Sequence, residues 1–276
     1  MTSLLPTHLA VPSLSLFISF GSRVSARSVM SSNHQIRVFP SPAELALSLT
    51  QLMINESQGK SSFSLGLSGG SLVSLLTREL TKTTGLDTKG WKVAMCDERL
   101  VPFTDPESTY GEYLRQLIPS EKLSESQFIT IDPSLSVEEC AADYTKKLRE
   151  ILPGNDIPVF DMLILGVGPD GHTASLFPGH SLLQVTDQIV APISDSPKPP
   201  AQRITLTLPV INAAKTVVFV ATGDGKAAVL KRILQEEESD PLPAARVSPV
   251  NGTLLWFLDE TAAQHLTCPV EKHSVL

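Results

Sequence analysis

A histidine and an aspartate lie two residues apart in a glycine-rich segment of the chain, residues 166–173 (GVGPDGHT). The segment follows an apolar run typical of a buried strand, so we predict a loop at a strand end. Histidine titrates near neutral pH, and His172 could therefore take a proton from water and return it to a leaving group. A structural histidine that caps a helix is the alternative. The Asp170-Gly171-His172 triplet at a strand end favours the catalytic interpretation.

The same segment contains a formal G-x-G-x-x-G pattern, which is typical of dinucleotide-binding loops. Asp170 would place a negative charge where a pyrophosphate needs positive potential, and Pro169 lacks an N–H group that would bind it. The carboxylate that would bind a ribose is also missing, because Asp187 precedes its apolar run instead of ending it. These features exclude dinucleotide binding.

A second loop that could bind a ligand, Ser68-Gly69-Gly70-Ser71, lies between a predicted strand and a predicted helix. Its glycines let backbone N–H groups approach an anion, and the helix presents the positive end of its dipole. The pattern predicts a phosphate site, although a tight turn with a serine helix cap has the same sequence. Arg203 and Lys226, expected near other strand ends, could bind the same phosphate. Either one alone would be interpreted as an ordinary surface base.

Three adjacent charged residues, Asp97-Glu98-Arg99, directly follow another apolar run. Side chains at a strand end are expected to face the crevice where ligands bind. A carboxylate there could orient a base or a substrate hydroxyl, and Arg99 could stabilise a developing oxyanion. The alternative is a solvated loop with a local ion pair.

Alternating strand and helix patterns predict the scaffold that positions these loops. Ser41-Pro42-Ala43-Glu44 is typical of a helix start, with Ser41 as the N-cap. The alternation predicts a single α/β domain, with a mainly parallel, Rossmann-like sheet and helices on both faces. A proline-rich stretch at 194–202 is expected to be a loop. Strands are expected at residues 36–39, 63–67, 91–95, 161–165, 204–208, 217–221 and 254–258, and helices after Ser41, at 72–80 and 137–151, after 223–225 and from Asp259.

Composition restricts the class of protein. The 276 residues are 42% hydrophobic and 18% charged, which predicts a globular chain with a substantial core. A net charge of −7 argues against nucleic-acid binding through a basic surface, so an anionic substrate would need a local basic pocket. Cys96, Cys140 and Cys268 have no ligand-type spacing. They argue against a disulfide framework and a structural zinc site, and for a reducing compartment.

The first 35 residues are expected to form an N-terminal extension, disordered or targeting, ahead of a domain at residues 36–276. Residues 1–43 contain no Asp or Glu and are rich in serine. The apolar stretch at 9–20 is broken by Pro12 and is too short to span a bilayer, and no basic residue precedes it as in a secretory signal. We expect a cytoplasmic protein without a membrane partner, an organellar transit peptide being the alternative.

The three motifs together resemble those of the 6-phosphogluconolactonase family. The similarity rests on GVGPDGHTASLFP at residues 166–178, on Asp97-Glu98-Arg99 and on the Ser68–Ser71 loop, and it covers residues 36–276. It implies an α/β fold and hydrolysis of 6-phospho-D-glucono-1,5-lactone to 6-phospho-D-gluconate, the second step of the oxidative pentose phosphate pathway. It also implies a small phosphorylated sugar lactone as the partner molecule, with no metal or other cofactor and no obligate protein partner.

The related glucosamine-6-phosphate isomerase/deaminase group shares the Asp-Gly-His loop but needs additional acid–base groups. Members of that group share a glutamate five residues after the histidine. This chain has Phe177 at that position, and phenylalanine cannot transfer a proton. They also have tyrosine after the Asp-Glu pair, where this chain has Arg99. Lactone hydrolysis needs only a base, an oxyanion stabiliser and a proton for the ring oxygen, so the lactonase is favoured.

The sequence leaves two functional assignments open, the carboxylate that orients His172 and the group that Arg99 binds. His172 is expected to activate water, oriented by Asp170 or by Asp97. Arg99 is expected to stabilise either the oxyanion or the phosphate. A non-catalytic sugar-phosphate sensor is a further alternative, which would be expected to lose the catalytic motifs while keeping the phosphate loop. The phosphate is expected to be bound by Ser68, Gly69, Gly70, Ser71, Arg203 and Lys226.

Overall fold

A computed structural model of the chain describes Met1, residues 34–152 and residues 156–274. From His34 to Ser274 these residues belong to one compact unit, as the sequence predicted. The N-terminal extension expected at residues 1–35 lies almost entirely outside the described residues. The first strand begins at His34, two residues before the expected start of the domain.

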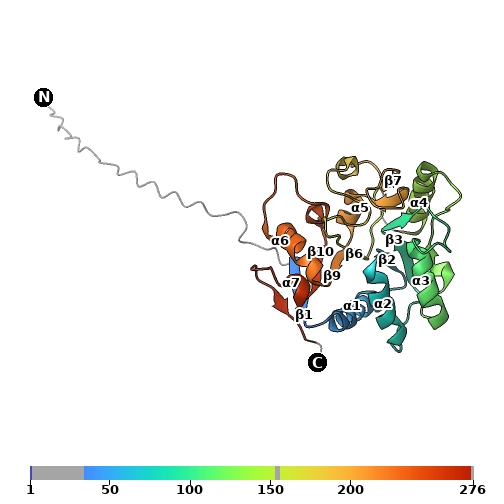
Figure 1. Cartoon of the computed structure of the whole chain (residues 1–276), viewed down its shortest axis with the longest axis horizontal. Coiled ribbons are helices and arrows are strands. Elements are labelled where there is room, and N and C mark those ends of the chain that lie inside the picture. The colour runs from blue at the N-terminus through green and yellow to red at the C-terminus, as the bar shows by residue number, and fades with distance from the viewer. Residues whose placement is uncertain (2–33, 153–155, 275–276) are drawn as a thin grey trace. The chain divides into compact units, whose positions relative to one another are not determined.

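Eight parallel strands form the central sheet, in the order β11-β1-β10-β9-β6-β2-β3-β5 (Figure 1). The central members β2, β6 and β9 are buried along almost their whole length, which explains their continuous apolar sequences. The strands are β1 (His34–Phe39), β2 (Phe63–Leu67), β3 (Trp91–Met95), β5 (Phe128–Ile129), β6 (Met162–Gly166), β9 (Thr216–Ala221), β10 (Thr253–Asp259) and β11 (Glu271–Lys272).

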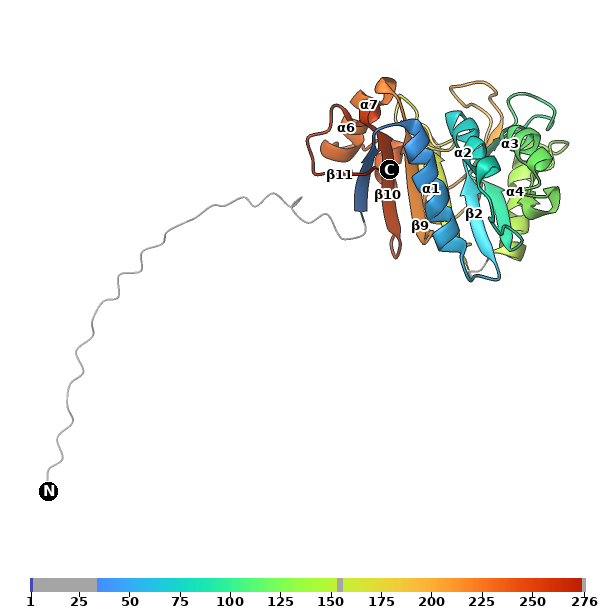
Figure 2. The same ribbon diagram turned by 90° about the horizontal axis from the view of Figure 1, so that it is seen from below.

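Helices cover both faces of this sheet, as predicted. On one face, α1 (Pro42–Ser57), α2 (Ser71–Lys82) and α3 (Thr109–Leu117) pack in one apolar cluster, and Figure 2 shows α1 and α2 in front of the strands. On the other face a second cluster contains α4 (Val137–Ile151), α5 (Leu208–Ala213), α6 (Ala227–Gln235) and α7 (Glu260–Ala263). Alternate strand residues supply the two clusters because side chains in a strand point to opposite faces. The 3-10 helices are Ile118–Ser120, Glu125–Gln127, Ser181–Gln184, Asp224–Lys226 and Pro243–Arg246.

A small antiparallel sheet on the second face was not predicted. It consists of β4 (Asp97–Arg99), β8 (Arg203–Leu206) and β7 (Val190–Ile193), in that order. The charged triplet Asp97-Glu98-Arg99, expected at the end of the preceding strand, forms a short strand of its own that pairs with β8. It is not the solvated loop that the sequence left as the alternative. Similarly, β8 was expected among the parallel strands and pairs antiparallel to β4 and β7.

The end of the chain also differs from expectation. A terminal helix from Asp259 was predicted, but α7 has only four residues, and the chain then returns to the sheet as β11 beside β1. Asp259 caps α7 by accepting a hydrogen bond from Ala262 N at 2.8 Å, and it also accepts from Gly223 N at 3.0 Å. This carboxylate therefore fixes the loop between β9 and α6, which carries Lys226.

Candidate active site

A cleft of about 200 Å³ lies at the carboxyl ends of β2, β6 and β9, where ligands bind in open parallel sheets. The residues assigned to catalysis and phosphate binding from the sequence line this cleft, except Asp170, which contacts His172. The tertiary structure thus brings together loops that are separated by more than 150 residues in the sequence.

The loop after β6 holds His172 and Asp170 against each other. Its turn is closed by hydrogen bonds from Gly168 N to His172 O (2.8 Å) and from Gly171 N to Gly168 O (2.9 Å). His172 Nδ1 lies 2.5 Å from Asp170 Oδ1. Only glycine fits at position 168, since a Cβ there would lie 1.9 Å from His172 Nδ1. The sequence left open whether Asp170 or Asp97 contacts this imidazole, and the geometry places Asp170 there.

Burial and neighbouring charges shift the pKa values of both Asp170 and His172. Burial pulls the pKa of Asp170 upward, but the hydrogen bond and charge of His172, together with a nearby lysine, hold it at about 2. Burial is the largest effect on His172 and lowers its pKa, while Asp170 acts in the opposite direction. At neutral pH the pair is therefore an aspartate beside a neutral imidazole. Since the ionised carboxylate can only accept, Nδ1 carries the hydrogen and Nε2 has the free lone pair.

The loop at Ser68–Ser71 joins β2 to α2 and lies along the cleft. Serine side chains cap α1, α3 and α4, but no described side chain caps α2, whose N-cap is Gly70. Gly70 has φ +74° and ψ −148°, a conformation that is essentially restricted to glycine. No side-chain cap therefore occupies the first N–H groups of α2, which lie beside the cleft. Such N–H groups at a helix start can bind an anion.

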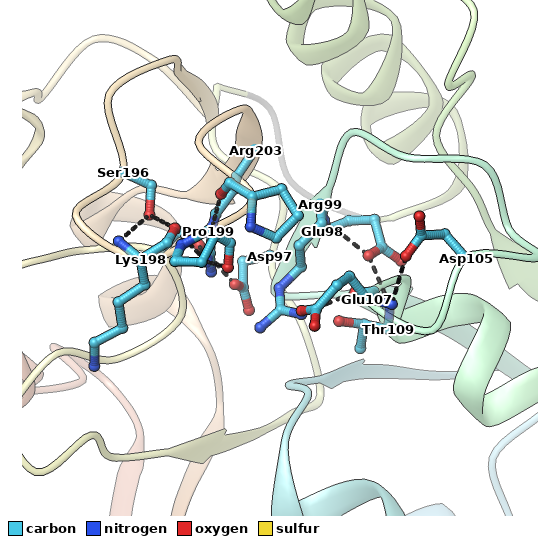
Figure 3. A network of polar contacts seen from close by, with 12 residues as sticks. Asp97, Glu98, Arg99, Asp105, Glu107, Thr109, Ser196, Lys198, Pro199 and Arg203 are labelled. Carbon is cyan, nitrogen blue, oxygen red and sulfur yellow. Dashed lines mark hydrogen bonds and ion pairs between the residues drawn. The ribbon is translucent and has the colours of Figure 1, made fainter.

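Arg203 is deeply buried, with 3% of its surface exposed, and its guanidinium binds the proline-rich loop (residues 194–202). Nε donates to Pro200 O at 2.9 Å, and Nη2 donates to the carbonyls of Lys198 and Pro199 at 2.9 and 3.0 Å (Figure 3). Nη1 approaches Ser175 Oγ at 3.4 Å. The phosphate contact predicted for Arg203 stays a prediction, and the structure adds an anchoring function that sequence did not indicate.

The side chains of the β4 triplet point to two sides of the strand, those of Asp97 and Arg99 towards the cleft and that of Glu98 away from it. Arg99 lines the cleft, and in the antiparallel β4–β8 pair it is the cross-strand partner of Arg203. Its Nη1 donates to Glu107 O at 2.8 Å. Asp97 also lines the cleft, where Oδ2 accepts a hydrogen bond from Ser175 Oγ at 2.7 Å. The adjacent positive charges of Arg99 and Arg203 favour a bound anion nearby.

Glu98 faces away from the cleft, contrary to the expectation that the triplet faces it. It is 1% exposed and accepts hydrogen bonds from the backbone N–H groups of Arg99, Thr109 and Tyr110 at 2.7–2.8 Å. Burial raises the pKa of this carboxyl to about 7, although the three N–H donors oppose the shift. Glu98 thus ties the start of α3 to β4.

Sequence reasoning missed Lys198 and Phe177 as neighbours of His172. Lys198 Nζ lies 3.0 Å from His172 Nδ1 and 3.1 Å from Asp170 Oδ2. The Phe177 ring packs on the imidazole with a centroid distance of 4.9 Å. Lys198 is the only basic residue in the stretch 194–202, which was the one available signal, but sequence does not show where that loop folds.

Lys226 also lines the cleft, and it follows the loop that Asp259 fixes. Burial lowers its pKa, and the charge of Lys198 acts in the same direction. Within residues 34–152 and 156–274, no three His, Cys, Asp or Glu side chains group closely enough to hold a metal ion. In the same part of the chain, no helix has both the length and the apolar character needed to cross a membrane.

Comparison with known proteins shows the family of this chain. The family described as glucosamine-6-phosphate isomerases/6-phosphogluconolactonase matches residues 40–256. The chain belongs to this family. Two relatives named 6-phosphogluconolactonase, from Bos taurus and Homo sapiens, are each 59% identical over 250 residues, covering 87% of this chain and 97% of theirs.

A solved structure of the family has the same fold. The 6-phosphogluconolactonase from Trypanosoma brucei superposes with a TM-score of 0.76 at 27% identity, covering 84% of this chain and 98% of that one. The fold class and the family resemblance that the sequence indicated are both confirmed.

Proposed function

We propose that this chain hydrolyses 6-phospho-D-glucono-1,5-lactone to 6-phospho-D-gluconate, in the second step of the oxidative pentose phosphate pathway. The family membership and the names of the relatives at 59% identity support this function. The observation that carries it is the His172–Asp170 pair beside the Ser68–Ser71 loop, because it joins a base to an anion site in one cleft.

Water activation is assigned to Nε2 of His172. Asp170 accepts from Nδ1–H and so fixes the tautomer, which leaves the Nε2 lone pair to accept a proton. The water oxygen forms a bond to the lactone carbonyl carbon as its proton passes to Nε2. The resulting oxyanion is stabilised by Arg99 and by backbone N–H groups of the loops. When it collapses, the bond from this carbon to the ring oxygen breaks, and the Nε2 proton passes to that oxygen.

Binding of the phosphate is assigned to the Ser68–Ser71 loop, Lys226 and Arg203. These groups hold the end of the substrate that does not react, so their binding energy fixes the carbonyl relative to His172. Arg99 lines the same cleft and is assigned to the oxyanion, with phosphate binding as the alternative.

Phe177 argues against an aldose–ketose isomerisation at this site. That reaction needs a further carboxylic acid, and in the related deaminases the corresponding position holds glutamate. Here the residue is a buried phenylalanine packed against His172, and its side chain has no proton to transfer.

The test is the initial rate of 6-phosphogluconolactone loss above the spontaneous rate in buffer, for wild type, His172→Ala and His265→Ala. Removing the base is expected to lower kcat by a factor on the order of 100 or more. His265 is exposed and outside the cleft, so its variant is expected to match wild type. A folded wild type without acceleration, or ammonia release from glucosamine 6-phosphate, would refute the assignment.

The domain limits and the location are proposed from the sequence. We place the catalytic domain at residues 36–276 of a cytoplasmic enzyme that needs no nucleic acid and no obligate protein partner. A chain that starts at Met30 is expected to keep full activity, measured in the same assay. Fluorescent fusions with and without residues 1–29 are expected to have the same cytoplasmic distribution, whereas an organellar signal from the longer fusion alone would favour a transit peptide.

A further inference from the structure

The proline-rich loop places a cation against the His172–Asp170 pair. Lys198 Nζ lies 3.1 Å from Asp170 Oδ2 and 3.0 Å from His172 Nδ1. Asp170 Oδ1 is already occupied by His172 Nδ1, so the two carboxylate oxygens have different partners. The ammonium also lies 5.9 Å from the centre of the Phe177 ring, which packs against the imidazole.

The backbone that carries Lys198 is fixed on both sides. Arg203 Nη2 binds the carbonyls of Lys198 and Pro199, as Figure 3 shows. Ser196 Oγ donates to Lys198 O at 2.8 Å and accepts from Lys198 N at 3.3 Å. These hydrogen bonds fix the backbone from which the Lys198 side chain reaches Asp170 and His172.

We propose that Lys198 is a positioning residue that holds Asp170 in place and keeps the neighbouring His172 unprotonated for its function as a base. The proposal rests on the proposed function. Its physical basis is that an imidazolium beside an ammonium is disfavoured, whereas a neutral imidazole is not.

The charges that face His172 would otherwise favour its protonated form. Asp170 is in contact, and Asp97 lies on the cleft wall; both raise the pKa of His172. Burial is the largest influence in the opposite direction, and among the charged groups Lys198 lowers this pKa. Lys226 is another cation near the pair, close enough for its own pKa to be lowered by Lys198. Arg99 and Arg203 line the same cleft as His172. Lys198 therefore offsets the two carboxylates that the fold places around the base.

The test compares Lys198→Met, Lys198→Gln and Lys198→Arg with wild type, and Lys231→Met serves as a matched control. Lys231 lies on the exposed surface of α6, so its variant removes the same charge away from the site. Two quantities are measured: the titration midpoint of the His172 imidazole by NMR, identified by its loss in His172→Ala, and the pH profile of kcat/KM.

In Lys198→Met and Lys198→Gln, we expect the midpoint of His172 and the acid limb of the profile to move together to higher pH. Lys198 and Asp170 are each 38% exposed, so solvent screens their interaction. A screened ion pair of this kind corresponds to a loss of about two- to fivefold in kcat/KM on the acid limb, decreasing towards alkaline pH. Lys198→Arg and Lys231→Met are expected to match wild type.

Two results would overturn the proposal. A higher KM with an unmoved acid limb would make Lys198 a substrate ligand. A uniform loss of kcat with an unchanged His172 titration would make it only a structural support of the loop. The NMR titration does not depend on turnover. A shifted midpoint in a protein that does not accelerate lactone hydrolysis would therefore refute the proposed function and not the effect of Lys198 on His172.

Discussion

Replacing Asp170 with asparagine removes the negative charge beside His172 while almost preserving the size of the side chain. With a pKa of about 2, Asp170 is ionised throughout a normal assay range, and it accepts from His172 Nδ1 and from Lys198 Nζ. The imidazole becomes a cation as it takes the proton from water, so the charge of Asp170 matters more in the transition state than in the ground state.

The size of the effect follows from that hydrogen bond. A hydrogen bond to a charged partner contributes roughly 1.5–3 kcal/mol, so Asp170→Asn is expected to lower kcat by roughly 10- to 150-fold with little change in KM. The charge of Asp170 raises the pKa of His172, so its loss is expected to move the acid limb of kcat/KM to lower pH. This direction is opposite to the one expected for Lys198→Met.

The assay is the pH profile of lactone hydrolysis, corrected for the spontaneous rate at every pH. The control is Asp195→Asn, because Asp195 pairs with His180 at 3.0 Å outside the cleft and is 77% exposed. That variant is expected to match wild type. If Asp170→Asn keeps kcat within twofold of wild type with an unshifted acid limb, the orientation of the base by Asp170 is refuted.

Two further predictions concern the phosphate site and the buried carboxyl. Lys226→Ala is expected to raise KM for the lactone by roughly tenfold or more, with a smaller effect on kcat, because a charged contact to the phosphate is lost; Lys231→Ala is the control, and an unchanged KM in steady-state kinetics would contradict the assignment. The pKa of Glu98 is raised to about 7 by burial, so the folded state binds a proton that the unfolded state releases near pH 4.5. Its contribution to the free energy of unfolding is present at low pH and is lost, by about 3 kcal/mol, as pH rises from 4.5 to 7. Glu98→Gln is expected to abolish this slope in urea unfolding measured across that range, and parallel slopes in the two proteins would contradict the shift.

Local patterns were sufficient for most of the scaffold. The apolar runs at β2, β3, β6, β9 and β10 predicted strands because each is buried on both faces of a parallel sheet. Ser41 was predicted as an N-cap and accepts from Glu44 N at 3.2 Å. The predicted helix at 137–151 has the same bounds in the structure, where Ser136 caps it. In each case the signal lies within a few neighbouring residues.

Some features of the site could likewise be predicted from local sequence, whereas others depend on contacts between distant parts of the chain. The sequence by itself determined that His172, Asp170 and the Ser68–Ser71 loop follow apolar strands, and parallel strands necessarily bring their carboxyl ends to one edge. Only the tertiary structure decided that Asp170 and not Asp97 contacts the imidazole, and that Glu98 points away from its two neighbours. Strand side chains alternate in direction, so the pairing of β4 with β8 had to be known first. The place of Lys198 depends on a loop fixed by Arg203, and no local pattern encodes where such a loop folds back.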